Sequence, residues 1–98
     1  MIHHIVMFRL EGDAIQVADA AFKFKTALEA LPANIEALSA ISCHLNNVPA
    51  DGNWTLVLHA ECADEAALAT YAAHPAHIAC VALIKPLIAA RACVDYTL

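Results

Sequence analysis

The opening segment constrains the fold of this chain most, because it is a predicted strand with apolar residues on both faces. Its side chains alternate, with Ile2, His4, Val6, Phe8 and Leu10 on one face and His3, Ile5, Met7 and Arg9 on the other. A strand with one face in water normally alternates apolar with polar residues, so this pattern predicts cover on both sides. We expect helices of the same chain on one side and the sheet of a partner subunit on the other.

The composition supports this expectation of a partner. Apolar residues make up 61% of the 98 residues, whereas an average globular chain has roughly 45–50% even when glycine is counted. A single domain of this size, spanning residues 1–98, buries only about 60–65% of the surface that its unfolded chain exposes. The surplus of apolar side chains must therefore be covered by another chain, lie along a pocket, or be diluted as alanine, which is a large part of it, and a homodimer is expected.

Charge and hydropathy argue against several classes of protein. The net charge is −5, and the five Lys and Arg residues form no cluster, so binding to nucleic acid is not expected. No apolar run approaches the roughly 20 residues of a membrane helix, and the first residues do not resemble a secretory signal. The four cysteines are widely spaced in apolar contexts, as is typical of small core residues in a reducing compartment. We therefore expect a cytoplasmic protein that does not bind membranes.

The remaining pattern predicts an α+β fold. Asp13 is a suitable N-cap for a helix that runs to about Leu31, and Asp64 is a suitable N-cap for a second helix that is interrupted at His74-Pro75. Further strands are expected over residues 38–45, 54–61 and 90–97. This order is the ferredoxin-like βαββαβ unit, a four-stranded antiparallel sheet with helices on one face. Two such sheets packed face to face would form a dimeric α/β barrel.

The segment Tyr71-Ala72-Ala73-His74-Pro75-Ala76-His77 carries the most polar chemistry. Pro75 is best tolerated in the first turn of a helix, which places His77 near a helix N-terminus, where the helix dipole favours neutral imidazole. His4 lies on an apolar face of the first strand, and burial there favours its neutral form as well. With the Tyr71 hydroxyl, these groups would suit acid/base chemistry beside an apolar cavity.

Three marks together give this chain a family resemblance: His4 in the opening strand, the Tyr-x-x-His-Pro-x-His run from Tyr71 to His77, and Asp95-Tyr96 near the end. The chain resembles the stress-responsive dimeric α/β-barrel (Dabb) family over nearly its whole length. The resemblance implies the dimeric barrel described above. One branch, a plant polyketide cyclase, uses a strand histidine and the second histidine of the His-Pro-x-His run, which correspond here to His4 and His77.

The chain departs from that branch at two positions. The third strand of the cyclase carries a pocket histidine where this chain has Leu56, and its first helix offers a tyrosine where this chain has Ala27. His59 does not replace the missing histidine, because its parity along the strand is opposite to that of Leu56. A different ligand or a smaller one is therefore expected.

The predicted site combines three catalytic candidates, His4, His77 and Tyr71, with a ligand pocket and no organic cofactor. The pocket residues are Val6, Phe8, Phe24, Leu56, Leu58, His74 and Val81. The expected ligand is a small aromatic or β-keto-like molecule. Two other functions stay open: a non-catalytic, stress-related assembly module, in which the histidines only satisfy hydrogen bonds, and a monooxygenase-like activity.

Two further side-chain roles are weighed. His74 and His77, three residues apart, could share a metal ion with His4, but Pro75 disturbs the backbone between them and no metal is assigned. The charge of Asp95 needs a partner or water, and Arg91 and Lys85 are the expected partners. His3 is expected on the face opposite His4, in an interface or at the surface.

Overall fold

The computed structural model describes residues 1–98 and has the predicted order of elements. The strands are β1 (Ile2–Leu10), β2 (Ala40–Leu45), β3 (Leu56–Cys62) and β4 (Ile88–Thr97). The helices are α1 (Ala14–Glu29), α2 (Glu65–Ala73) and α3 (Pro75–Ala82), with single 3-10 turns at Leu31–Ala33 and Lys85–Leu87. No helix in the chain combines the length and the apolar character that a membrane crossing requires.

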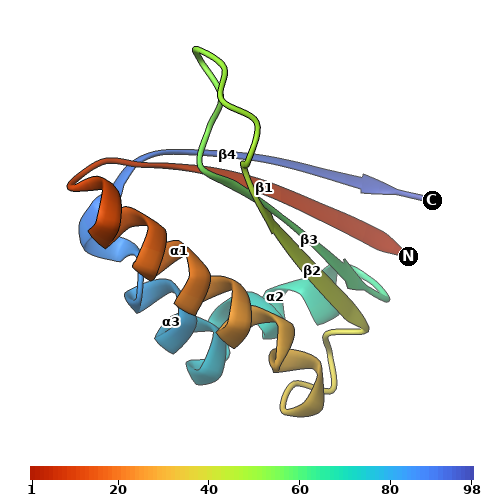
Figure 1. Cartoon of the computed structure of the whole chain (residues 1–98). Coiled ribbons are helices and arrows are strands. Elements are labelled where there is room, and N and C mark those ends of the chain that lie inside the picture. The colour runs from red at the N-terminus through yellow and green to blue at the C-terminus, as the bar shows by residue number, and fades with distance from the viewer.

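The four strands form one antiparallel sheet in the order β2-β3-β1-β4. The two crossovers, through α1 and through α2 and α3, place all the helices on one face of the sheet, as Figure 1 shows. The other face carries no element of the chain. The predicted ferredoxin-like fold is therefore confirmed, and it leaves one open sheet face and one helix-covered face.

The alternation in β1 separates these two faces. Val6, Phe8 and Leu10 are buried beneath the helices, whereas Met7, on the open face, is 41% exposed. The helix-covered face joins one apolar core with side chains of α1, including Phe24 and Leu28, which are fully buried. Burial of Val6, Phe8 and Leu10 fixes the register of β1, because a shift by one residue would move these side chains to the open face.

Helix α1 begins and is oriented as the sequence predicts. The Asp13 carboxylate accepts a hydrogen bond from the Gln16 amide and so caps the helix N-terminus. Near the other end, the Lys25 ammonium donates to the Glu29 carboxylate and to the Cys43 carbonyl, which ties α1 to β2. The apolar stripe of α1 thereby stays against the sheet.

The interruption at His74-Pro75 divides the second crossover into two helices. Asp64 caps α2, and His74 ends α2 with extended backbone angles before Pro75 opens α3. The residue before a proline avoids the α-helical region, and proline is well tolerated at the first helical position. The break turns the chain, so that Tyr71 and His77 come from two different helices on the same side of the sheet.

Some predicted details differ in the structure. Strand β2 begins at Ala40 rather than near Leu38, because the Leu38 amide donates to the Ile35 carbonyl in a turn. Strand β4 begins earlier than predicted, at Ile88, and pairs with Leu10 across a register shift in β1. Cys93 is exposed in the protomer because β4 is an edge strand, whereas the other three cysteines are buried as expected.

Candidate active site

A cavity of about 660 Å³ lies between the sheet and the helices α2 and α3. Its wall is mostly apolar and comes from β1, β3, β4 and all three helices. Among the residues predicted for the site, those on the wall are His4, Val6, Phe8, Phe24, Leu58, Tyr71, His77 and Val81. Segments far apart in the sequence therefore bring two imidazoles and one phenol to a single cavity.

His4 is held by Asp95 on the neighbouring strand. The two residues lie opposite each other in the β1–β4 ladder, and His4 Nδ1 is 2.5 Å from Asp95 Oδ1. An ionised carboxylate only accepts hydrogen bonds, so neutral His4 carries its proton on Nδ1. Its Nε2 atom makes no hydrogen bond within the protein and is left as a proton acceptor.

In His77, as in His4, a hydrogen bond holds the proton on Nδ1, but the acceptor is a backbone carbonyl. Its Nδ1 atom donates to the Ala72 carbonyl at 3.0 Å, which also leaves Nε2 as the unprotonated nitrogen of the neutral ring. Burial lowers the pKa of His77 below its usual value, and the nearby charges of His4 and Arg91 lower it further, against the opposing effect of the Ala72 carbonyl. His77 is therefore a neutral base near pH 7.

Tyr71 packs near both imidazoles. Its ring centroid is 4.5 Å from that of His77 and 6.3 Å from that of His4. The side chain is 1% exposed, and its hydroxyl is the one buried side-chain polar group without a hydrogen-bond partner in the protein. Burial raises the pKa of the Tyr71 phenol, with smaller contributions from Cys62 and Cys80, so the hydroxyl stays protonated.

Together these groups place two imidazoles and one buried phenol around an apolar cavity, and each imidazole has an Nε2 atom without a hydrogen-bond partner in the protein. An unsatisfied buried hydroxyl costs free energy unless something pairs with it, and a ligand oxygen is a suitable partner. The arrangement can move a proton at a substrate atom and stabilise negative charge on a nearby oxygen.

Two predicted pocket residues lie outside the cavity wall. His74 uses Nδ1 to accept a hydrogen bond from the Ala76 amide, so its imidazole caps α3. Leu56 is buried in the main core opposite Phe8, near the end of the sheet away from His4. The donor atoms of His4, His74 and His77 do not form one of the groups close enough to hold a metal ion together.

Three side chains at or near the cavity, Asp95, Arg91 and Lys85, had another role in the sequence-based prediction, where they were expected to pair with one another. Asp95 pairs with His4 and not with Arg91 or Lys85, and both of these cations line the cavity instead. In the antiparallel ladder Arg91 lies opposite Phe8 and therefore shares its face. The alternation of side chains along β4 could have predicted that Arg91 and Asp95 share one face of the sheet. It does not predict which residues of β1 lie opposite them until the pairing of the two strands is known.

A second polar cluster lies on the open face of the sheet. His3 Nδ1 is 2.8 Å from His59 Nε2 and 3.4 Å from a Glu61 oxygen, and the His3 ring stacks on Tyr96. This placement agrees with the expectations that His3 faces away from His4 and that His59 faces away from Leu56. Donor atoms of His3, His59 and Glu61 lie close enough to hold a metal ion, as do those of His4, Cys93 and Asp95.

The fold and the cavity together define a ferredoxin-like α+β protein with a largely apolar cavity between sheet and helices. A family model described as "Stress responsive A/B Barrel Domain" matches residues 2–98. The chain belongs to this family, in agreement with the resemblance noted from its sequence.

Solved structures with the same fold include two dimeric relatives of unknown function. A dimeric ferredoxin-like protein from Bacteroides fragilis is 33% identical, with a TM-score of 0.94, over 99% of this chain and 95% of its own. A dimeric ferredoxin-like protein from Thermobifida fusca is 32% identical, with a TM-score of 0.80, over 99% and 90% of the two chains. These relatives support self-association of the family fold.

More distant structures share the fold alone. A structure described as an antibiotic biosynthesis monooxygenase is 18% identical, with a TM-score of 0.79, over 100% of this chain and 98% of its own. None of the functionally curated proteins matches this chain.

Proposed function

We propose that this protein binds a small, largely apolar carbonyl compound, of aromatic or β-keto type, and transfers a proton at the carbon next to the carbonyl group. The observation that carries the proposal is that two imidazoles, each with an Nε2 atom free of hydrogen bonds to the protein, and the buried, unpartnered phenol of Tyr71 belong to the lining of one apolar cavity. An open cavity that both His4 and His77 line favours this function over a purely structural assembly module.

In the proposed reaction, Nε2 of His77 accepts a proton from the carbon next to the carbonyl group, and the ring becomes an imidazolium. The electron pair of the broken C–H bond moves toward the carbonyl oxygen, which becomes an enolate oxygen. The Tyr71 hydroxyl, which stays protonated, donates a hydrogen bond to that oxygen.

His4 would act as the second acid/base group in this reaction. Asp95 orients its ring and stabilises the imidazolium that forms when Nε2 takes up a proton. The proton can then return to the same carbon or to another one. No step of this scheme uses an organic cofactor.

We also propose that the open sheet face forms a homodimer with a second copy. Met7 and Val94 are exposed there, next to the His3 cluster, and the relatives from Bacteroides fragilis and Thermobifida fusca are dimeric. Covering this face would bury the apolar surplus of the sequence and close two sheets into an α/β barrel.

Exchange of carbon-bound protons for deuterium tests the proton-transfer step directly. Phenylacetone is incubated with the protein in D₂O, and the loss of its α-proton signals is followed by NMR. We expect exchange above the buffer rate, and His77→Gln should lower the protein-dependent rate by about 10²–10⁴-fold. His44→Gln, on an exposed position of β2, serves as the control. Equal rates for the original protein and His77→Gln would contradict the proposal.

A further inference from the structure

The basic residues of this chain fall into two groups, those that form ion pairs and those that line the cavity. Three of the five, Arg9, Lys23 and Lys25, form ion pairs with Glu11, Asp19 and Glu29. The other two, Lys85 and Arg91, form none, although the chain has ten acidic residues for five basic ones. These two unpaired cations are the two that line the cavity.

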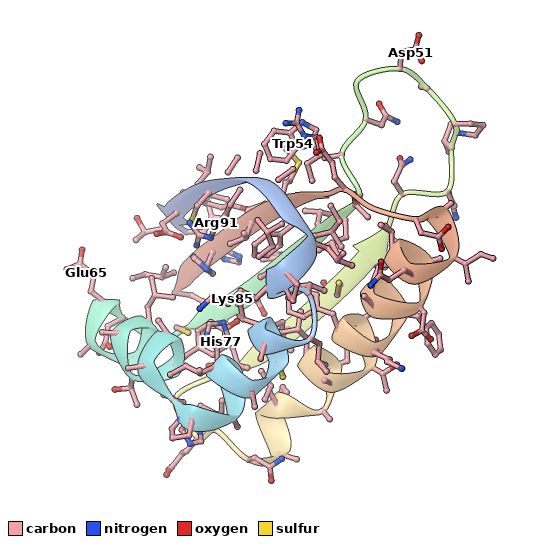
Figure 2. The ribbon with its side chains drawn as sticks, turned by 90° about the vertical axis from the view of Figure 1, so that its left-hand side faces the viewer. Asp51, Trp54, Glu65, His77, Lys85 and Arg91 are labelled. Atoms are coloured by element: carbon pink, nitrogen blue, oxygen red, sulfur yellow. The ribbon has the colours of Figure 1, made fainter.

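Both cations reach the cavity from positions set by the fold. Lys85 lies in the 3-10 turn after α3, and Arg91 lies on β4 opposite Phe8. Figure 2 shows His77, Lys85 and Arg91 together between the sheet and α3. The Arg91 guanidinium is close enough to lower the pKa of His77, after the larger effect of burial.

The acidic residues around the cavity do not neutralise this pair. Asp95 is engaged with His4. Glu65 lines the cavity as well, but it lies at the outer end of α2, apart from Lys85 and Arg91 in Figure 2. The remaining wall is mostly apolar.

We propose that the ligand of this cavity is a carboxylic acid with an apolar body, whose carboxylate is held by Arg91 and Lys85. A guanidinium can bind a carboxylate through two parallel hydrogen bonds, and the ammonium adds a second charge. The apolar body then lies along Val6, Phe8 and Val81. This inference rests on the proposed function and adds the ligand's charged group to it.

Binding of a matched pair of probes, 4-butylbenzoate and 4-butylbenzamide, measured by calorimetry at low ionic strength, tests the inference. The two probes have nearly the same shape and differ in charge. We expect the acid to bind at least 10-fold more tightly than the amide, and the preference to weaken as salt is added. Arg91→Gln should remove most of this preference, and Lys85→Gln should reduce it. Lys23→Gln, which removes an exposed cation of α1, should leave it unchanged.

The possible results separate this inference from the proposed function. Equal binding of acid and amide would overturn the carboxylate assignment and leave the cavity as a small-molecule site. Binding of neither probe would overturn the inference together with the proposed binding function. If Arg91→Gln does not fold, Lys85→Gln and the salt dependence still decide the question.

A competition with inorganic phosphate distinguishes the amphiphilic acid from a simple anion. Because phosphate lacks the apolar body, it should bind weakly, and 10 mM phosphate should change the affinity for 4-butylbenzoate less than twofold relative to sodium chloride of the same ionic strength. Displacement of the acid by low millimolar phosphate would overturn the assignment to a carboxylic acid.

Discussion

His4 and Asp95 form one hydrogen-bonded unit although 91 positions separate them in the chain, with Nδ1 and Oδ1 2.5 Å apart. The contact exists because β1 and β4 are antiparallel neighbours and place the two residues directly opposite each other. It places the proton of neutral His4 on Nδ1 and leaves Nε2 as the nitrogen that can accept a proton. The edge strand β4 is therefore part of the candidate active site.

Replacing Asp95 should impair the site more than the fold. In Asp95→Asn the carboxylate that stabilises the imidazolium of His4 is lost, so we expect the phenylacetone exchange rate to fall about 10–100-fold. Asp19→Asn, an equivalent change on the exposed face of α1, is the matched control. Full exchange activity in Asp95→Asn would show that the His4–Asp95 pair is structural.

Tyr71→Phe should separate stability from function. The folded protein gives the buried Tyr71 hydroxyl no partner, whereas the unfolded chain hydrates it. Removing it should therefore leave the free energy of unfolding unchanged or raise it by about 1 kcal/mol. The exchange rate should fall, because the hydrogen bond to the enolate oxygen is lost. A clear loss of stability in urea denaturation would instead indicate a structural hydrogen bond.

The lowered pKa of His77 predicts how stability changes with pH. As the pH falls through about 6.5, His77 in the unfolded chain takes up a proton that the buried ring in the folded protein resists. The contribution of His77 therefore lowers the free energy of unfolding as the pH falls from about 6.5 to the lower pKa that His77 has in the folded protein. Denaturation of the original protein and of His77→Gln at pH 7 and pH 5 measures this contribution, because the other histidines are common to both.

We expect His77→Gln to lose less stability than the original protein between these two pH values. Proton-transfer activity should also fall when the pH falls below the pKa of His77, since the protonated ring is no longer a base. An equal loss of stability in both proteins would contradict the assignment of a lowered pKa to His77.

A charge on the open sheet face should weaken self-association. Val94 is 63% exposed on β4 in the protomer, and Val94→Glu would place a carboxylate within the proposed interface. We expect the dimer dissociation constant, measured by analytical ultracentrifugation, to rise at least 10-fold. Ile15→Glu on α1 introduces the same charge at an exposed apolar residue of the helix layer and should have no such effect. A protein that is monomeric without any substitution would refute the proposed interface.

Much of this protein was determined by local sequence patterns. The two-faced alternation of β1, the caps at Asp13 and Asp64, and the break at Pro75 predicted the order of elements and the ferredoxin-like fold. Such signals are readable because they depend on residues within one or two turns of one another, or within one strand. The same patterns predicted that His4 would lie on the face covered by the helices and that His77 would lie near the start of a helix that follows Pro75.

Tertiary structure decided the partners of these residues. His74 was predicted to line the pocket, but the backbone before Pro75 directs its imidazole to the Ala76 amide. Asp95 was predicted to pair with Arg91 or Lys85, but the ladder places it against His4. Strand register and the packing of α2 and α3 bring together residues that are far apart in the sequence, and no local pattern encodes those distances. The pairing of Asp95 with His4 also leaves Lys85 and Arg91 as unpaired charges at the cavity.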